Sequence, residues 1–367
     1  MSKPKIAVMV ATSGHSGVDS VIGNLVAGLC NRGYRVDLLK IRKHGPYNIP
    51  DSENLEIVEL PYAHVNSCLF SLARYLHRVQ PDVLLTDKYK VNRLALLAKM
   101  ISRSCTKVVV RMGTTVSRDL QQRGASEAFI HKLSIRLFYH LAQAIIFPSK
   151  GSAEDFSREF PGLTSRIRAL PSPIVSPELY NLAGEQISHP FLDDKDRKVV
   201  IGVGELSKRK NFGLLLRTFA QVRQKITCRL LILGEGRQRF YLEGLARDLG
   251  IKEDVDFPGF VQNPYPYMAS ADLFVLSSLF EGSPVVLMEA LGLGLPVVSM
   301  NCPSGPEEIL DQGRYGHLVS MQDPKDMAGA MIDTLNNPPS SEFQKQGSRE
   351  YHRDNSVQKY LEAFGLG

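Results

Sequence analysis

The chain has 367 residues, of which 43% are hydrophobic and 22% are charged. That length is typical of about two domains of ~150 residues each, and the composition argues against a disordered, collagen-like or coiled-coil protein. Residues 1–180 hold 24 Lys and Arg against 14 Asp and Glu, whereas residues 181–367 hold 20 against 24. A basic first half fits contact with an anionic membrane or a nucleic acid, and equally a solvated basic surface.

The first residues, MSKPKIAVMVATSG, combine a short apolar run with a glycine turn and lack a small-residue cleavage site. They predict a first β-strand rather than a signal peptide. The five Cys are scattered and form no C-x-x-C motif, which argues against a disulfide framework or a zinc site and favours a reducing cytosol. Residues 283–300 are apolar, but Glu289 and two each of Pro and Gly interrupt them, so we expect a buried strand–helix–strand passage rather than a membrane span.

Apolar strand-like runs alternate with amphipathic helical segments along most of the chain. Strands are expected in the first half at 6–11, 35–40, 82–86, 107–111 and 144–148, and in the second half at 199–203, 229–233, 272–277 and 296–300. A helix is expected over residues 19–32, and residues 160–197, with five Pro, are the predicted interdomain linker. The alternation predicts an α/β protein with two Rossmann-like, doubly wound domains facing a cleft.

Each half opens with a strand, a glycine loop and a helix. Gly14 and Gly17 precede the first helix, and in the second half Gly202 and Gly204 precede the cationic run 208–210. Glycines and helix N-termini let a phosphate approach backbone N–H groups, although glycines also simply close tight turns. Neither loop completes the dinucleotide fingerprint and Walker A is absent, so a nicotinamide oxidoreductase or a P-loop NTPase is a weak interpretation.

Two glutamates stand in an unusual setting in the second half. Pro284 fits the first turn of a helix, which leaves Glu281 in the preceding loop and Glu289 among apolar residues inside the helix. A carboxylate in such a helix needs a partner, and a ligand hydroxyl is a candidate. The eight-residue offset itself is unspecific, because it also separates Glu235/Glu243 and Glu342/Glu350.

Residues 199–319 resemble the donor domain of retaining glycosyltransferases of family 4 (glycosyl transferases group 1), which have the GT-B fold. The matching stretches are GELSKRKNF (204–212), LILGEG (231–236), DFPGFVQNPYPYMASADLFVLSS (256–278), EGSPVVLMEAL (281–291), PVVSMNCPSGPEEIL (296–310) and GHLV (316–319). The first half and the tail match more loosely, at 17–39, 144–156, 170–174 and 356–364. Within that family the chain is most similar to enzymes that assemble lipopolysaccharide core, capsule and lipid-linked oligosaccharides.

The resemblance implies an acceptor-binding domain over 1–180, a nucleotide-sugar donor domain over 181–345, and a C-terminal helix within 346–367 that crosses back onto the first domain. It implies a retaining hexosyltransferase that moves a hexose or N-acetylhexosamine from a nucleotide diphosphate sugar to a hydroxyl of a glycan or lipid-linked saccharide. The donor expected from family habit is a UDP-sugar, with no metal or other cofactor. The expected location is cytoplasmic, with peripheral contact to an anionic membrane through the basic first domain.

The resemblance also implies roles for single residues. Lys210 matches a lysine that binds the donor diphosphate, Glu289 a carboxylate that holds the ribose hydroxyls, and Glu281 a carboxylate that contacts the transferred sugar. The expected catalytic set is therefore Glu281, Arg209 and Lys210. The further donor-binding positions are Gly17, Glu289, Ser283, Pro284, Val285, Gly204, Phe260 and Val261.

Two positions depart from the family pattern. The usual Gly-Arg-Leu is Gly-Glu-Leu at 204–206, so Arg209 is the expected substitute for the missing diphosphate arginine. Met112 stands where many relatives place a His, while His131 and His140 are expected to be surface or packing residues. The departing phosphate oxygen could take the acceptor proton, so no enzyme base is obligatory. The Asp-x-Asp string at 254–256 is interpreted as chance rather than as a metal site.

Other functions remain open from the sequence. A nucleotide-sugar epimerase of the same fold would need carboxylates and histidines in the first domain, where no convincing set appears. A nucleic-acid-binding protein lacks a recognition module, and a non-catalytic sugar-nucleotide-binding protein would carry the same donor motifs. The stretch 128–142 places Lys132, Arg136 and His140 at helical spacing, which fits either a lipid-surface helix or a packed helix with a solvated basic face.

Overall fold

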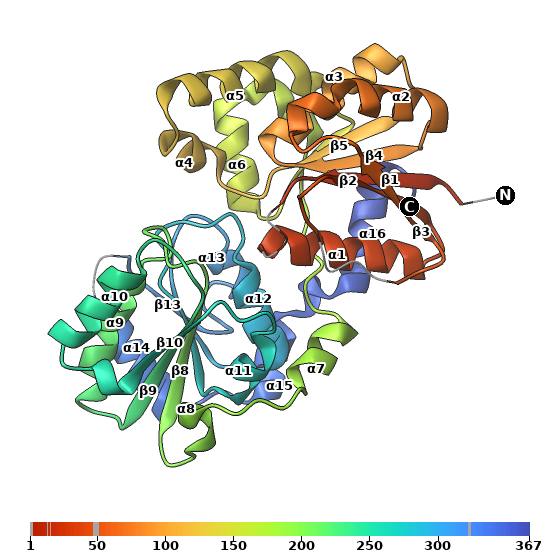
Figure 1. Cartoon of the computed structure of the whole chain (residues 1–367). Helices are drawn as coiled ribbons and strands as arrows, with labels where there is room; N and C mark the ends of the chain where they lie inside the picture. Colours follow the sequence, from red (N-terminus) through yellow and green to blue (C-terminus); the bar gives the residue numbers. More distant parts are fainter. Residues whose placement is uncertain (1–2, 13, 15, 47–50, 322–323) are drawn as a thin grey trace. The chain divides into compact units, whose positions relative to one another are not determined.

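A computed structural model describes residues 3–12, 14, 16–46, 51–321 and 324–367 of the chain. The chain forms two compact units (Figure 1): unit 1 comprises Met1–Ile174 and Tyr351–Gly367, and unit 2 comprises Val175–Glu350. The divisions follow residues 174 and 350, whereas those expected from the sequence follow residues 180 and 345. The C-terminal residues from 351 onward belong to unit 1.

Unit 1 is built on a parallel sheet. Among its described residues, seven strands pair in the order β3-β2-β1-β4-β5-β6-β7. Their bounds are β1 (Lys5–Val10), β2 (Arg35–Ile41), β3 (Leu55–Leu60), β4 (Val83–Asp87), β5 (Lys107–Arg111), β6 (Ala144–Phe147) and β7 (Ile167–Ala169). The order reverses between β1 and β4, which is the switch point of a doubly wound sheet.

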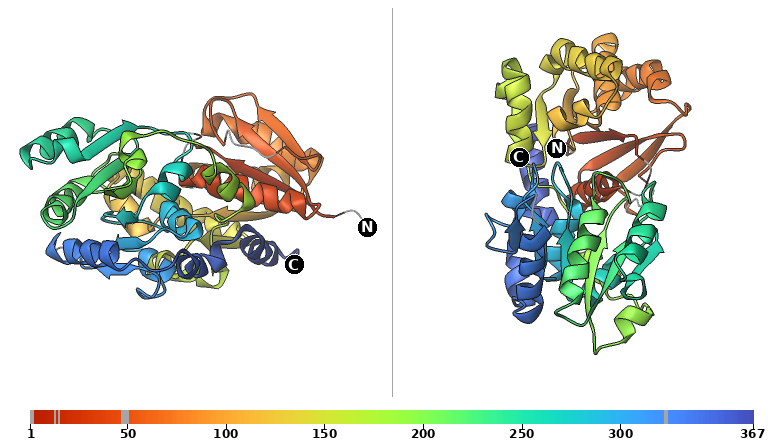
Figure 2. Two further views of the ribbon diagram at one scale, coloured as in Figure 1. Left: turned by 90° about the horizontal axis from the view of Figure 1, so that it is seen from below. Right: turned by 90° about the vertical axis from the view of Figure 1, so that its left-hand side faces the viewer.

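Helices cover both faces of this sheet (Figures 1 and 2). The α-helices are α1 (Gly17–Asn31), α2 (Leu69–Val79), α3 (Tyr89–Ser102), α4 (Val116–Gln121), α5 (Ala125–Phe138), α6 (Lys150–Glu159) and α16 (Arg353–Phe364). The 3-10 helices are η1 (Val65–Cys68), η2 (Tyr139–Leu141) and η3 (Pro161–Arg166). The helix expected over 19–32 is confirmed as α1.

Alternating residues of β1 show how two cores form from one strand. Ile6, Val8 and Val10 pack with α1 and α16, whereas Ala7 and Met9 pack with the helices of the opposite face. The C-terminal helix lies close against α1, because a Cβ added to Gly28 would stand only 2.6 Å from Val357. The tail of the chain thus completes the core of unit 1.

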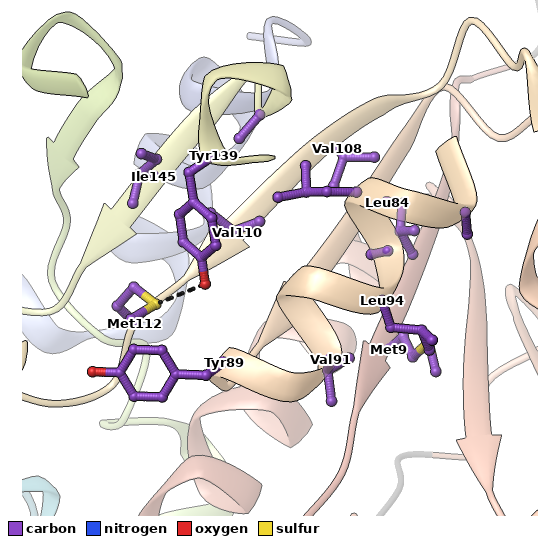
Figure 3. Close-up of a cluster of buried hydrophobic side chains, with 14 of the residues drawn as sticks. Met9, Leu84, Tyr89, Val91, Leu94, Val108, Val110, Met112, Tyr139 and Ile145 are labelled. Carbon is purple, nitrogen blue, oxygen red and sulfur yellow. Dashed lines mark hydrogen bonds between the residues drawn. The ribbon is translucent and has the colours of Figure 1, made fainter. Parts of the chain in front are cut away.

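Met112 lies in the second of these cores (Figure 3). It is 2% exposed, and the hydroxyl of Tyr139 donates a hydrogen bond to its sulfur at 3.6 Å, as does the Asn92 amide at 3.3 Å. His131 is buried and stacks on Tyr89, with ring centroids 4.6 Å apart. Met112 and His131 are therefore packing residues in this fold, as expected for the histidine.

Unit 2 repeats the doubly wound plan. Six strands among its described residues are all parallel and follow the order β10-β9-β8-β11-β12-β13. Their bounds are β8 (Lys198–Val203), β9 (Cys228–Leu233), β10 (Val255–Gly259), β11 (Leu273–Leu276), β12 (Val297–Met300) and β13 (His317–Val319). The order reverses between β8 and β11, so loops after these strands diverge at the carboxyl edge.

The helices of unit 2 also form two layers (Figure 1). Helix α9 contacts α10 and α14 on one face, and α12 contacts α7, α11 and α15 on the other. The α-helices are α7 (Pro177–Ala183), α8 (Pro190–Asp193), α9 (Phe212–Arg223), α10 (Arg239–Asp248), α11 (Tyr265–Ser270), α12 (Val285–Leu293), α13 (Pro306–Ile309), α14 (Pro324–Asn336) and α15 (Ser341–Gly347). The 3-10 helices are η4 (Lys252–Asp254) and η5 (Arg349–Tyr351), the latter crossing the boundary into unit 1.

The strands expected from the sequence are all present, within two residues at each end. The prediction missed β3, β7, β10 and β13, which are the edge strands of the two sheets. The linker prediction over 160–197 was wrong in extent, because this stretch contains η3, the edge strand β7, α7 and α8. Its five prolines mark turns and helix starts within the two units rather than one continuous linker.

Candidate functional site

The carboxyl ends of three strands in unit 2 carry glycines, and their backbones lie in close contact. Gly204 follows β8, Gly234 follows β9, and Gly259 ends β10. The Gly234 N–H donates to the Gly259 carbonyl at 2.8 Å, and a Cβ on Gly234, whose φ is +141°, would collide with the Gly204 carbonyl. Glycine is needed here because the strand ends approach too closely for side chains. Gly204 itself lies against Lys210, whose Cε is 3.0 Å from the position of an added Cβ.

Glu281 is the centre of a buried charge cluster in unit 2. Its carboxylate accepts from Arg209 at 2.5 Å, from Lys210 at 2.7 Å and from the Ser278 hydroxyl at 2.8 Å. Burial raises the pKa of Glu281, but Lys210 and Arg209 more than offset this, so the net pKa is lowered. The three residues predicted as catalytic, Glu281, Arg209 and Lys210, therefore lie together in one cluster of charges.

Backbone contacts hold the loops that carry these charges. The Ser277 hydroxyl, at the end of β11, donates to the Lys210 carbonyl at 2.8 Å. On the other side, the Glu281 N–H donates to the Pro303 carbonyl, and the Ser304 N–H donates to the Glu281 carbonyl, both at 2.9 Å. Loops after β8, β11 and β12 therefore fix the carboxylate and the lysine relative to each other.

Glu289 lies within α12, the helix that follows the loop of Glu281. It is 4% exposed, and the Tyr265 hydroxyl of α11 donates to its carboxylate at 2.9 Å. Burial raises its pKa to about 7, while the Tyr265 hydrogen bond and the Lys210 charge act in the opposite direction. Glu289 is thus a buried carboxyl group that holds a proton far more readily than Glu281.

Two buried hydroxyls on the loops that carry these charges lack a hydrogen-bond partner. Ser283 Oγ stands just before α12 and Ser207 Oγ lies in the loop after β8, and neither has a hydrogen-bond partner among the described residues. Pro284 occupies the N-cap position of α12, and Val285 is the first residue of the helix. No side-chain hydrogen bond caps this N-terminus in the described part of the chain. The first-turn N–H groups and the two hydroxyls are donors suited to an anion.

Other predicted donor-binding residues have separate surroundings. Phe260 and Val261 follow β10, and Phe260 is 53% exposed. Gly17 opens α1 in unit 1 and is not part of the group assembled within unit 2. The N-terminus of α1 is already occupied by Asp19, which accepts from the Ser16 N–H at 2.8 Å and the Ser16 hydroxyl at 2.6 Å.

Two partners of the glutamates were missed from the sequence. Ser278 stands three residues before Glu281, and a search for hydroxyls near that glutamate could have found it. Tyr265 is 24 residues from Glu289, and no sequence signal links them. In the 254–256 string, Asp254 pairs with Arg223 at 2.6 Å, and Asp256 contacts His189 at 2.9 Å, so both aspartates serve the fold.

Two features are absent from the described residues. No three His, Cys, Asp or Glu side chains gather there in a way that could hold a metal ion. None of the helices described combines the length and apolar character needed to cross a bilayer. The groups that unit 2 does bring together are two cations beside one carboxylate of lowered pKa, a second carboxyl of raised pKa, and buried hydroxyls without partners among the described residues.

Comparison with known proteins places both halves of the chain. Residues 197–337 match the family described as Glycosyl transferases group 1, and residues 15–175 match Glycosyltransferase Family 4. A Campylobacter jejuni protein, N-acetylgalactosamine-N,N'-diacetylbacillosaminyl-diphospho-undecaprenol 4-alpha-N-acetylgalactosaminyltransferase, is 30% identical over 336 residues, which are 88% of each chain.

Solved structures agree on the fold. Anabaena Alr3699/HepE in complex with UDP and glucose superposes with a TM-score of 0.78 over 99% of each chain, at 17% identity. The lipopolysaccharide outer core galactosyltransferase WaaB superposes with a TM-score of 0.73 over 98% of this chain and 99% of WaaB, also at 17% identity. The two parallel sheets with their alternating helices are those of the GT-B fold. With both family matches and the Campylobacter relative, the chain belongs to the family 4 (group 1) glycosyltransferases.

Proposed function

We propose that this glycosyltransferase moves a hexose or N-acetylhexosamine from a nucleotide diphosphate sugar, preferentially a UDP-sugar, to a hydroxyl of a lipid-linked saccharide. The observation that carries the proposal is the cluster of Arg209, Lys210 and Glu281 beside the uncapped N-terminus of α12. The Campylobacter relative is named for an acceptor on diphospho-undecaprenol, and the Anabaena structure is described as holding UDP and glucose. Both names support the proposed substrates.

The cations would bind the diphosphate. As the glycosidic bond to the diphosphate breaks, negative charge grows on the phosphate oxygens, and donors fixed in advance stabilise it. Lys210 is 9% exposed, so its charge is poorly screened by water. Arg209 is more exposed and would take the place of the arginine that Glu205 replaces. Ser283 and the first N–H groups of α12 add neutral donors to the same anion.

The carboxyl groups would hold the two ends of the donor. Glu281, ionised and fixed by three hydrogen bonds, would accept from hydroxyls of the transferred sugar. Glu289 would accept from the ribose hydroxyls, in competition with the Tyr265 hydroxyl. The ribose would favour the ionised form of Glu289, because that form only accepts hydrogen bonds, whereas the protonated form carries a donor on one oxygen.

The stereochemical proposal is retention without a metal. The acceptor hydroxyl would attack from the face of the leaving diphosphate, and a phosphate oxygen would take its proton. Arg209 and Lys210 would supply the positive charge that a metal ion supplies in other transferases. Gly17 is proposed to approach the donor phosphates from unit 1, as the family resemblance implies.

A donor panel tests this function. Thermal unfolding is measured with UDP-, GDP- and ADP-sugars, because a ligand that binds the folded state raises its stability by mass action. Nucleotide release is then followed with a lipid-linked acceptor, with and without EDTA. The proposal expects stabilisation by a UDP-sugar and acceptor-dependent release that EDTA leaves unchanged. Binding without release identifies a non-catalytic sugar-nucleotide-binding protein, and epimerised sugar without acceptor identifies an epimerase.

A further inference from the structure

Tyr265 contacts only one of the two carboxylate oxygens of Glu289. Its hydroxyl donates to Glu289 Oε1 at 2.9 Å, and none of the described residues donates a hydrogen bond to Oε2. Glu289 is 4% exposed, so little water reaches this carboxylate. A carboxylate oxygen removed from water is costly to leave without a donor. Oε2 is therefore the oxygen of Glu289 that is ready to accept from a hydroxyl of a ligand.

The backbone around Tyr265 is fixed by a second polar side chain. Helix α11, which Tyr265 begins, contacts both α12 and α7 (Figure 1). The Tyr265 N–H donates to Asn263 Oδ1 at 3.2 Å. The Asn263 amide in turn donates to the Leu182 carbonyl at 2.9 Å and to the Glu185 carboxylate at 2.8 Å. Asn263 thus ties the start of α11 to the end of α7, so Tyr265 reaches Glu289 from an anchored position.

Two side chains favour the ionised form of Glu289. Tyr265 does so through its hydrogen bond and Lys210, in the loop after β8, through its charge, whereas burial raises the pKa of Glu289. The titratable residues on the other helices that contact α12 leave this pKa unchanged within the described chain: Glu178, Tyr180, Glu307, Glu308, Glu342 and Lys345. Without the Tyr265 hydroxyl, the pKa of Glu289 should therefore rise above about 7.

We infer that Tyr265 is a positioning residue for the nucleotide ribose: its hydroxyl holds Glu289 Oε1 and thereby aims Oε2 at a ribose hydroxyl. This inference rests on the proposed role of Glu289 in donor binding and adds the residue that prepares Glu289 for it. A ribose hydroxyl at Oε1 would compete with Tyr265, whereas no described donor competes at Oε2. A carboxylate that is fixed before binding loses less conformational freedom when the ribose arrives.

A pair of tyrosines on α11 allows a matched test. Tyr265→Phe keeps the ring and removes the hydroxyl that contacts Glu289. Tyr267→Phe is the control, because the Tyr267 ring packs near His189, with centroids 6.1 Å apart, and its hydroxyl makes no hydrogen bond to the described residues. Calorimetry measures the UDP affinity of the full-length variants from about pH 6 to about pH 9, a range that spans the pKa of Glu289.

The pH profile of UDP affinity is the readout that a merely structural role would not move. Tyr265→Phe should shift its midpoint upward by about one to two pH units, the effect of one hydrogen bond to a charged group. At about pH 7 the affinity should fall about fivefold or more, because less of Glu289 is ionised. Tyr267→Phe should match the natural chain, and Glu289→Gln should remove the contribution of this carboxyl to the profile.

Two further measurements separate positioning from general damage. Pyrophosphate contains the diphosphate without the ribose, so Tyr265→Phe should bind it as the natural chain does, whereas Lys210→Ala should bind it more weakly. Without ligand, the loss of stability that accompanies ionisation of Glu289 should move to higher pH in Tyr265→Phe, because the pKa of Glu289 is raised. Thermal unfolding over the same pH range measures this shift.

The outcomes distinguish this inference from the proposed function. A natural chain that binds no UDP refutes the proposed function and this inference with it. UDP binding that depends on Glu289 but keeps the same pH midpoint in Tyr265→Phe refutes the inference alone. Equal shifts in Tyr265→Phe and Tyr267→Phe also overturn it, as does an equal loss of affinity for UDP and pyrophosphate in Tyr265→Phe.

Discussion

The two units share a strand order but use their carboxyl edges differently. In unit 2 the edge carries Glu281 with two cations and, nearby, two hydroxyls without partners. In unit 1 the comparable buried pair is Asp87 and Arg111, 2.5 Å apart at the ends of β4 and β5. Arg111 also donates to the Tyr360 hydroxyl of α16 at 3.2 Å and to the Ser172 hydroxyl at 3.1 Å. The pair in unit 1 therefore ties the returning C-terminal helix to the sheet.

Helix N-termini show the same contrast. Asp19 occupies the start of α1, so that positive end is neutralised within the chain. No side chain caps α12 among the described residues, and Ser283 beside it has no partner there. The start of α1 thus receives a carboxylate from the chain itself, whereas the start of α12 leaves donors for a ligand. Strand order alone does not distinguish the two uses.

The largest expected effect is the loss of stability when the buried pair of unit 1 is broken, because we expect this pair to serve stability alone. Asp87→Asn leaves Arg111 as an unpaired buried charge, which should cost about 3–5 kcal/mol of unfolding free energy. Affinity for UDP should stay unchanged. Urea unfolding and calorimetry measure the two quantities, with Glu235→Gln as a control whose exposed pair with Arg239 contributes ~0–1 kcal/mol. Weakened UDP binding by a stably folded Asp87→Asn would break the contrast between the units.

The next effect concerns turnover in unit 2. Glu281→Gln should lower the rate of nucleotide release by about 10²–10³-fold, the range for removing one preorganised contact to a transition state. UDP affinity should hold or rise, because Arg209 and Lys210 lose a competing carboxylate. Glu235→Gln and Glu342→Gln head the other glutamate pairs of the same spacing and should change neither quantity. Near-natural turnover by Glu281→Gln would refute its proposed role at the sugar.

The cations should act on nucleotide binding. Lys210→Ala and Arg209→Ala each remove a charge-assisted hydrogen bond worth about 1.5–3 kcal/mol, so UDP should bind about tenfold or more weakly. The effect should be larger for Lys210, since its charge is more deeply buried. Calorimetric titration with UDP measures both, and Lys208→Ala serves as the neighbouring control. Natural affinity in Arg209→Ala would end the proposal that it replaces the missing arginine.

A further effect is a pH dependence of stability at Glu289. Below about pH 4.5 this carboxyl is protonated in both states, and between 4.5 and about 7 only the folded protein holds the proton. Stability from this group is therefore full at low pH and is lost as pH rises through 7, by about 3 kcal/mol in total. The melting temperature of Glu289→Gln should therefore rise relative to that of the natural chain between roughly pH 4 and pH 8, the window that these pKa values set.

The same variant should bind nucleotide less well. If the ribose binds the ionised form of Glu289, then UDP binding should release the proton of Glu289. The release should be seen near pH 6, a value taken as about one unit below the pKa of Glu289 in the folded protein. Calorimetry in buffers of different ionisation heat detects that release, and Glu289→Gln should abolish it while losing about 1–3 kcal/mol of affinity. Proton release that survives in Glu289→Gln would assign it to another group.

Much of the fold could be predicted because central strands are buried on both faces. Every residue of β4 and β11 is buried and most are apolar, so these strands stand out in the sequence. The edge strands gave no such signal: β3 exposes Glu56, Ile57 and Glu59, and β7 is barely buried. A strand paired on one side needs less apolar surface, so its sequence resembles a loop.

The sequence by itself determined the doubly wound plan, the loop position of Glu281 and the helical position of Glu289. Periodicity and turn residues encode these features locally. Only the tertiary structure decided that Arg209 and Lys210 both pair with Glu281, that Tyr265 reaches Glu289, and that α5 turns its apolar stripe outward. These contacts join residues on different loops and helices. Their distances depend on how whole elements pack, which no local pattern of residues specifies.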